Sequence, residues 1–475
     1  MLGRHPAKGR LAAWLLLGAV GCAAGRADPP VRDPVDLRYD IHHRLENGRS
    51  LEVTLWLPPD HPRHFLFAAP GAIGEVELTR SSGEQRTLEI PADGALLLEA
   101  DDSQVRYRFR FPSQGSVRSG AVGQEGAMVP GRVYLLRPRQ ARDERFAQLR
   151  FTGAEVMLPW NNPGPEGWYR IRESDLIDAG FHTFGGRRCS RRLEGARLEL
   201  RVIDLPTTLG DVAVCDWVAQ AAAEVLTVRQ RFPYERVAVT VVTVASSEAS
   251  PFGMLMWSEP PSVVLLAGRS AGTGQLRRDW VAVHELLHLI HPTFLRRGTW
   301  LSEGLATYYT EVARMRSGRF TQAAGWAELV TGFQRGAAQG GPRTVTELAS
   351  QGGGYLGYYW GGAAILLELD VAIRRASGEA RSLDSALELL GQGGFTATLE
   401  EFGAAVDEAA GQPLWEQLTR QRLSQPPGAG TEALLRQLGV LPAGASVTFD
   451  DQAPLAAIRR ALSRRASPPS QPGNQ

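Results

Sequence analysis

Residues 283–309 of this 475-residue chain read VHELLHLIHPTFLRRGTWLSEGLATYY and hold three histidines and two glutamates among apolar residues. The apolar periodicity predicts an amphipathic helix from Leu276 to His291. On that helix His284 and His288 are four residues apart, so their imidazoles share one face, about one turn apart. With Glu285 they form the pattern H-E-x-x-H, in which the two histidines bind zinc and the glutamate acts as general base.

A third metal ligand is expected, because a catalytic zinc usually takes three protein ligands and keeps an open position for water. The candidates are His291 and Glu303. On a straight helix His291 lies about 10 Å along the axis from His284, too far for one zinc with bonds of about 2 Å. Glu303 follows a turn and begins a second helix, predicted over 301–314, which can return antiparallel. We therefore predict one zinc ion held by His284, His288 and Glu303. The alternative is a histidine pair packed by chance against a core carboxylate.

The overall composition is that of a folded protein. Hydrophobic residues make up 43% and charged residues 22% of the chain, and the length suggests two to four domains. The formal net charge is +1, so no basic field points to a nucleic-acid partner.

Residues 1–21 have the layout of a secretory signal peptide. A basic start precedes an apolar run from Leu11 to Val20, which is too short to span a membrane. The run ends in small residues followed by Cys22, as in a bacterial lipobox, although Ala19 stands where leucine is usual. We expect Cys22 to be lipidated and to anchor the exported chain in the periplasm or on the outer surface. Cleavage after a small residue without lipidation is the alternative.

Two further cysteines, Cys189 and Cys215, follow in the sequence. Disulfides persist in exported proteins, and a bridge closing a loop of roughly 25 residues could stabilise the fold by about 3 kcal/mol. We expect this bridge; two buried free thiols are the alternative.

The fold class predicted is multidomain α+β. Residues 22–35 indicate a polar tether, and 36–171 an N-terminal β-sandwich. Asn47-Gly48 between two extended runs is a strong hairpin signal, and VRYRFRF at 105–111 alternates apolar residues with arginines, as in a sheet with one buried and one solvated face. Residues 172–315 mix strands, at 236–244 and 262–268 among others, with helices. Residues 316–445 form a helical domain, and 446–475 a C-terminal extension whose tail is disordered by composition.

HELLH followed by WLSEGLATYY resembles the gluzincin zinc metallopeptidases, and the chain is more closely similar to their glycyl aminopeptidase family. The supporting segments are LIDAGFHTFG, RFPYERVAVTVV, YYWGGAAILLELDVAIRR and SLDSALELL, and the likeness covers roughly 35–440. The resemblance implies a thermolysin-like zinc catalytic domain at 172–315. It also implies a tyrosine that stabilises the oxyanion: the YWGG segment selects Tyr359, with Tyr358 and Tyr355 as alternatives.

Two features depart from that family. Its members usually carry a C-terminal PDZ-type peptide-binding domain, for which the helical end of this chain leaves no room. Related aminopeptidases also hold the free amine of the substrate with a glutamate on an edge strand. In the matching segment FGMLMWSEPP that position is Leu255, and Glu259 stands nearby at a different spacing. An unpaired ammonium is costly to desolvate, so strict aminopeptidase specificity is in doubt.

These residues predict an exported zinc-dependent metallopeptidase acting on peptides or proteins. The zinc would activate water and polarise the scissile carbonyl, Glu285 would move the proton from the water to the leaving amine, and Tyr359 would donate to the oxyanion. Thr307, one turn after Glu303, is expected to support the ligands. The alternative function is a catalytically inactive zinc-binding surface lipoprotein. The presence of Glu285 favours the enzyme, because a purely structural site needs no base.

Overall fold

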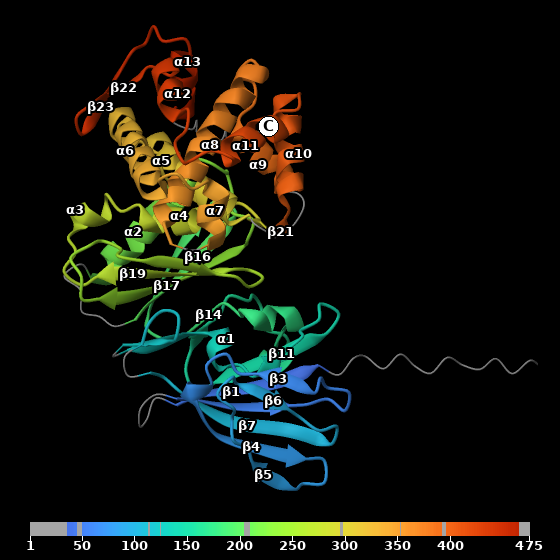
Figure 1. The fold of residues 1–475 in the computed structure, drawn as a ribbon. Helices are drawn as coiled ribbons and strands as arrows, with labels where there is room; N and C mark the ends of the chain where they lie inside the picture. The colour runs from blue at the N-terminus through green and yellow to red at the C-terminus, as the bar shows by residue number, and fades with distance from the viewer. Residues whose placement is uncertain are drawn as a thin grey trace, which may run out of the picture. The chain divides into compact units, whose positions relative to one another are not determined.

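Figure 1 shows the fold, which a computed structural model describes for residues 36–44, 50–112, 115–123, 125–203, 210–294, 298–351, 353–391 and 396–464. Residues from Asp36 onward form one compact unit. The predicted signal peptide, the tether, Cys22, the Asn47-Gly48 turn and the C-terminal tail lie outside the described residues. These predictions therefore stay predictions.

The N-terminal region is rich in strands, which form three sheets. The largest contains β1 (Leu37–Arg44), β2 (Ser50–Trp56), β4 (Ile73–Arg80), β5 (Gln85–Thr87), β7 (Asp102–Arg110), β11 (Phe146–Thr152) and β13 (Tyr169–Arg172), in the spatial order β13-β11-β1-β2-β7-β4-β5. A second has β3 (His64–Leu66) between β10 (Arg137–Pro138) and β6 (Ala95–Leu97). The third is β12 (Val156–Met157), β14 (Phe181–Gly185), β9 (Gly126–Pro130) and β8 (Ala121–Val122).

Strand β7 has one buried and one solvated face. Val105, Tyr107 and Phe109 are buried, whereas Arg106 and Arg110 between and beside them are exposed. Successive side chains of a strand point to opposite faces, so alternate residues are buried when one face packs against a core. The prediction that the arginines of this strand lie on its solvent-exposed face is confirmed.

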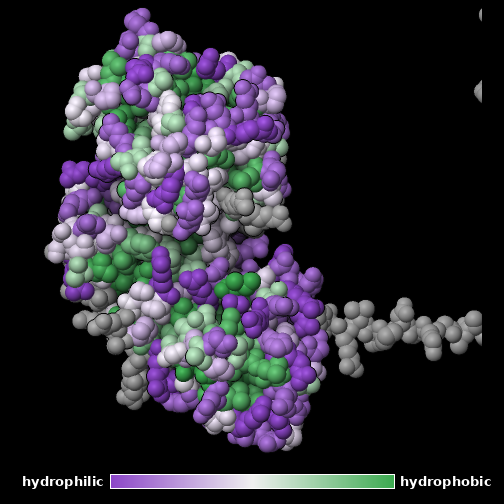
Figure 2. Space-filling view, in the orientation of Figure 1, coloured by the Kyte–Doolittle hydropathy of each residue, from purple (hydrophilic) through white to green (hydrophobic). Residues whose placement is uncertain are grey.

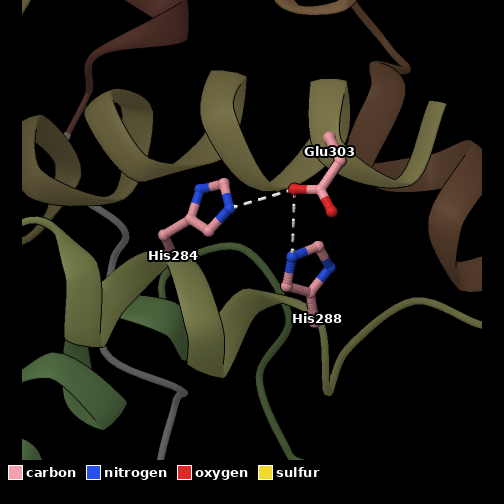
Figure 3. Close-up of side chains that lie close together, drawn as sticks. All are labelled: His284, His288 and Glu303. Atoms are coloured by element: carbon pink, nitrogen blue, oxygen red, sulfur yellow. Dashed lines mark hydrogen bonds and ion pairs between the residues drawn. The ribbon is translucent and has the colours of Figure 1, made fainter. Parts of the chain in front are cut away.

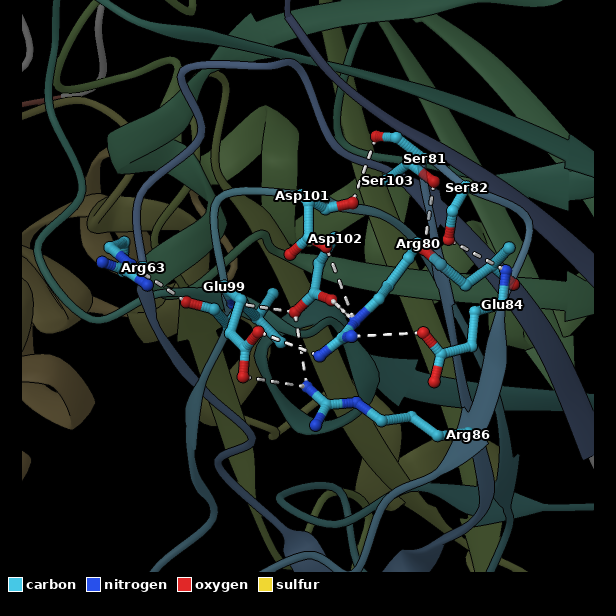
Figure 4. Close-up of polar contacts among 12 residues, drawn as sticks. Arg63, Arg80, Ser81, Ser82, Glu84, Arg86, Glu99, Asp101, Asp102 and Ser103 are labelled. Carbon is cyan, nitrogen blue, oxygen red and sulfur yellow. Dashed lines mark hydrogen bonds and ion pairs between the residues drawn. The ribbon is translucent and has the colours of Figure 1, made fainter.

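An ion-pair network closes the β4–β5 edge of the largest sheet (Figure 4). The guanidinium of Arg80 lies 3.2 Å from Glu84, 2.9 Å from Glu99, 3.7 Å from Asp101 and 3.9 Å from Asp102. The carboxylate of Asp102 is fully buried and accepts the backbone N–H of Glu99 at 2.8 Å. The network therefore ties the turn before β7 to the end of β4.

The strand-rich region extends beyond the boundary expected at 171. Strand β14 pairs antiparallel with β9, with Phe181 opposite Pro130. The backbone N–H of Phe181 also donates to Oγ of Ser262 at 2.8 Å, which links β14 to the following sheet. The change from one sheet system to the next thus falls just after Gly185.

The second region is built on a five-stranded sheet. Its strands, in spatial order, are β15 (Arg187–Leu193), β16 (Ala196–Ile203), β17 (Arg236–Val244), β19 (Ser262–Gly268) and β18 (Gly253–Met256). Strands β16, β17 and β19 are parallel, and β18 is an antiparallel edge strand. The strands predicted at 236–244 and 262–268 are confirmed as β17 and β19.

Helices α2 (Gly210–Val225), α4 (Val281–Leu287) and α5 (Thr299–Arg316) cover this sheet (Figure 1). Val218 of α2, Val239 of β17, Leu286 of α4 and Leu301 of α5 are fully buried in one shared core. The buried faces of these helices therefore fix where the histidines and Glu303 can lie.

The single helix predicted from Leu276 to His291 is wrong. The structure has a short helix α3 (Thr273–Leu276) and then α4, which begins after Asp279. The Asp279 carboxylate accepts the backbone N–H groups of Val281 at 3.3 Å and Ala282 at 2.9 Å, as a capping side chain does at a helix start. Helix α4 ends at Leu287, so His288 caps it and the chain turns before Pro292.

Downstream of α5 the chain is mainly helical, as predicted. The helices are α6 (Gln322–Gly340), α7 (Val345–Gln351), α8 (Tyr355–Ala376), α9 (Leu383–Leu390), α10 (Leu399–Ala410), α11 (Trp415–Leu423), α12 (Thr431–Gln437) and α13 (Ala456–Leu462). A hairpin of β22 (Val440–Ala443) and β23 (Ser446–Phe449) interrupts them, and β21 (Thr396–Ala397) pairs with β20 (Thr293–Phe294). Figure 2 shows largely hydrophilic side chains over these helices.

Helix α8 packs closely on α5. A Cβ added to Gly304 would lie 2.8 Å from the backbone carbon of Gly362, so the two backbones meet where neither residue has a side chain. By length and composition α8 is also the one described helix that could cross a membrane, and 67% of its apolar window is buried inside the protein. Because α8 contacts α5 at Gly304, it lies beside Glu303, the residue before Gly304.

Candidate metal centre

Three side chains from two helices converge on one point. His284 lies on α4, His288 caps the end of α4, and Glu303 lies on α5; Figure 3 shows both rings facing the carboxylate. Oε2 of Glu303 lies 3.3 Å from Nε2 of His284 and 3.5 Å from Nε2 of His288. One ligand atom of each residue lies within 4.8 Å of the other two. The structure thus brings the three predicted ligands together and leaves His291 outside the group.

The spacing and chemistry of this group fit zinc. Two imidazole nitrogens and a carboxylate oxygen form one of the ligand sets of catalytic zinc sites. Bonds of about 2.1 Å in a tetrahedral arrangement separate the ligand atoms by about 3.4 Å. The two nitrogen–oxygen distances, 3.3 and 3.5 Å, match that separation.

The charge state of Glu303 suits a ligand. Burial raises the pKa of its carboxyl group, but the imidazoles of His288 and His284 outweigh burial and hold that pKa well below its usual range. Glu303 is therefore ionised at neutral pH, as a metal ligand must be.

Glu285 lies against the edge strand β18. Burial raises the pKa of its carboxyl group to about 7, with His288 lowering it and Glu303 raising it, and the carboxyl accepts the backbone N–H of Leu255. A Cβ added to Gly253 would lie 2.4 Å from Cγ of Glu285, so only glycine permits this approach. Sequence reasoning did not identify Gly253 as a site residue.

His291 contacts the predicted ligand His288 and lies outside the group of three. Its Nδ1 lies 2.9 Å from the carbonyl oxygen of Pro292, and its Nε2 lies 3.2 Å from Nδ1 of His288. Burial, followed by the charge of His288, lowers the pKa of His291 to about 3, so its ring is neutral. His291 lies in the turn after α4, so the axial distance expected on a straight helix is not what keeps it out of the group.

Tyr359 lies beside two of the predicted ligands, His284 and Glu303. Its ring stacks on His284 with centroids 5.7 Å apart and planes 9° apart. Burial raises the pKa of its hydroxyl, as do the charge of Glu303 and a hydrogen bond to that carboxylate. Tyr358 and Tyr355 contact the ring of Tyr359, at 4.9 and 5.8 Å between centroids. The approach of α8 to α5 at Gly304 accounts for this position.

Three other residues singled out from the sequence are Thr307, Cys189 and Cys215. The hydroxyl of Thr307 is buried but has no hydrogen-bond partner among the described residues, so it supports none of the ligands. Cys189 of β15 and Cys215 of α2 are joined by a disulfide with their Cα atoms 6.5 Å apart. The bridge fastens a strand at the sheet edge to the first covering helix.

Comparisons with known proteins give a fold and no sequence family. No protein-family model and no curated protein matches the chain. Among solved structures, an aminopeptidase N family protein from Idiomarina loihiensis is similar at 15% identity and a TM-score of 0.68, over 88% of this chain and 82% of that one. The fold is aminopeptidase N-like. Aminopeptidase A from Legionella pneumophila, solved with aspartic acid, is similar at 14% identity and a TM-score of 0.50, over 83% of this chain and 49% of that one.

Within this aminopeptidase N-like fold, the edge strand β18 is apolar where it borders the metal centre. Leu255 packs against the core beneath the helices, whereas Met254 and Met256 pack into a separate cluster on the other face. Side chains of a strand alternate between faces, so Leu255 shares its face with Gly253, which abuts Glu285. Burial, followed by repulsion from the negative charge of Glu259, raises the pKa of the Asp175 carboxyl group to about 6.

Proposed function

We propose that the chain is an exported zinc-dependent metallopeptidase of the gluzincin type, with one zinc ion held by His284, His288 and Glu303. The observation that carries this proposal is the convergence of these three ligand atoms within 4.8 Å, with Glu285 buried beside them. The aminopeptidase N-like fold supports a peptidase, since both similar structures are described as aminopeptidases.

A zinc ion in this position would supply Lewis acidity for the scissile carbonyl and lower the pKa of water. A side chain of the protein must then accept the proton of that water and pass it to the leaving amine. Glu285 is suited to this because burial brings its pKa to about 7, close to the pH at which it would accept and return a proton. The N–H of Leu255 fixes the orientation of its carboxyl group.

Tyr359 would supply the hydrogen bond to the oxyanion. Its hydroxyl stays protonated because burial and Glu303 raise its pKa. Donors held in place before the reaction stabilise developing charge at little reorganisation cost. Its stacking on His284 keeps the ring beside the metal ligands.

The substrates we propose are peptides or proteins whose amino terminus need not be free. Leu255 provides no carboxylate for a substrate ammonium. The apolar edge of β18 suits extended backbone added as a further strand. Export to the periplasm or outer surface, through lipidated Cys22, belongs to the same proposal.

A test separates this enzyme from an inactive zinc-binding lipoprotein. Glu285→Gln removes the proton acceptor and leaves the three ligands, so it should retain one zinc per chain and lose nearly all turnover. Unchanged turnover with zinc present would refute the role of Glu285. Absence of hydrolysis in the zinc-loaded wild-type chain would favour the inactive lipoprotein.

A further inference from the structure

A basic pocket lies in the strand-rich region, apart from the metal centre. We use this name for the surface pocket of about 510 Å³ formed by Arg63, His64, Arg139, Arg142 and Arg145, with Pro62 and Gln140 completing its lining. Its lining includes no aspartate or glutamate, although Asp143 and Glu144 occur in the same loop. Four guanidinium groups thus surround one cavity.

Two chain segments far apart in the sequence build the pocket. Strand β3 pairs with β10, and the N–H of Arg139 just beyond β10 donates to the carbonyl of His64 at 2.9 Å. Arg145 closes the pocket at the start of β11, where its guanidinium donates to the Asp60 carbonyl at 3.3 Å and lies 3.9 Å from the Asp60 carboxylate. Arg63 donates to the carbonyl of Leu98 at 3.2 Å. Backbone pairing therefore fixes the walls of the pocket.

The guanidinium groups of Arg139 and Arg142 have no carboxylate at hydrogen-bonding distance among the described residues, although the carboxylate of Glu173 accepts the backbone N–H of Arg142 at 3.0 Å. Within the described ranges, the side chains of His64, Arg139 and Arg142 form no hydrogen bond or ion pair, and Arg139 and Arg142 are exposed. Like charges held together repel, and a bound anion removes that cost. The planar guanidinium forms paired hydrogen bonds to phosphate oxygens. The pocket therefore suits a phosphate-bearing anion.

The position of the pocket favours a lipid headgroup as the source of that phosphate. Strands β1 and β11 are parallel, with Leu37 opposite Ala147, so Asp36 lies beside the start of β11 and hence near Arg145. The first described residue of the chain therefore lies on the strand that neighbours β11, which begins just after Arg145. From Cys22 to Asp36 an extended chain spans at most about 50 Å. A lipid anchor at Cys22 would hold this end of the domain near the membrane.

We propose that the basic pocket docks the protein on a membrane by binding the phosphate headgroups of anionic phospholipids. Basic side chains near such a surface each add to the attraction. This inference rests on the proposed lipidation of Cys22 but not on the peptidase activity, because the pocket residues lie outside the candidate metal centre.

The test is vesicle co-sedimentation of the purified full chain carrying Cys22→Ser, so that no acyl group contributes. Vesicles of phosphatidylcholine alone give the baseline, and vesicles that also contain phosphatidylglycerol give the signal. Replacing Arg139 and Arg142 by glutamine should lower binding to the anionic vesicles roughly tenfold or more. The matched control replaces Arg106 and Arg375, two arginines outside the pocket, and removes the same charge.

The expected result is strong loss in the pocket variant and little change in the control. Equal loss in both variants would overturn the proposal, because net charge alone would then explain the binding. Binding no stronger to anionic than to neutral vesicles would also overturn it. Calorimetry with inorganic phosphate distinguishes the source: phosphate binding at the pocket without any preference for anionic vesicles would identify a free-phosphate site instead.

Discussion

Nδ1 of His288 lies 3.2 Å from Nε2 of His291, while Nδ1 of His291 lies 2.9 Å from the carbonyl of Pro292. A carbonyl can only accept, so the Nδ1–H of His291 donates to Pro292 and its Nε2 is left as an acceptor. Nδ1–H of His288 then donates to His291, which leaves Nε2 of His288 free to bind metal. The turn after α4 thus selects the tautomer of a ligand.

This hydrogen bond predicts that His291 tunes zinc affinity without binding zinc. His291→Phe keeps a ring to stack on Phe294 but removes the acceptor, so zinc affinity should fall about 10–100-fold. His291→Gln can accept through its amide oxygen and should retain most of the affinity. Competition with a chelating dye measures both. Equal affinities for the two variants would contradict the tautomer assignment. As a reference for complete loss, Glu303→Ala should bind no zinc.

Gly253→Ala should lower turnover while zinc is retained. The added methyl would lie 2.4 Å from Cγ of Glu285, so either the base or strand β18 must move. Displacement of a catalytic group by about 1 Å can reduce the rate about a hundredfold. Gly274→Ala is the control, since no atom lies within 4 Å of a Cβ there. Steady-state kinetics with zinc content measured in parallel decides, and wild-type kcat in Gly253→Ala would argue against the contact.

The strand-rich region should lose stability in mild acid through His182. Burial lowers the pKa of His182 to about 3, and the neutral ring accepts from the Tyr134 hydroxyl at 2.6 Å while donating to the Ala179 carbonyl at 2.9 Å. An unfolded histidine has a pKa of about 6.5. The stabilisation is therefore complete above pH 6.5 and is lost as the pH falls toward 3.

From pH 7 to pH 5 this group should remove about 2 kcal/mol from the free energy of unfolding. Urea unfolding followed by tryptophan fluorescence measures it, with His182→Gln as the comparison because glutamine does not titrate. The variant should show a shallower fall over that interval. An identical pH dependence in both proteins would exclude His182 as the cause.

Blocking the amino terminus of a peptide should not slow its hydrolysis. The resemblance to gluzincin aminopeptidases implies that Leu255 stands where their glutamate pairs with the substrate ammonium, and loss of one partner of such a pair commonly costs a few kcal/mol. Free and N-acetylated forms of one peptide should therefore have similar kcat/KM. A preference of tenfold or more for the free form, about 1.4 kcal/mol, would mean that another carboxylate binds the amine.

The ligand set was predictable because its geometry is local. Residues four apart on a helix share a face, and the turn between α4 and α5 is short enough to return Glu303 over His284 and His288. The break at Asp279 was not predicted, since a capping aspartate competes with an apolar pattern that continues through it. Other features join segments that are distant in the sequence. These are the contact between Gly253 and Glu285 and the lining of the basic pocket, and hydrophobic periodicity does not predict contacts of this kind.

The most direct test of the proposed peptidase is a peptide-library digest read by mass spectrometry, with the purified chain as isolated, after chelation, and after chelation followed by added zinc. The proposal predicts cleavage that disappears on chelation and returns with zinc, with internal cuts present. Glu285→Gln loaded with one zinc per chain should leave the library intact. Cleavage that persists after complete removal of metal, or none from a zinc-loaded wild-type chain, would contradict the proposal that His284, His288, Glu303 and Glu285 form a hydrolytic zinc centre.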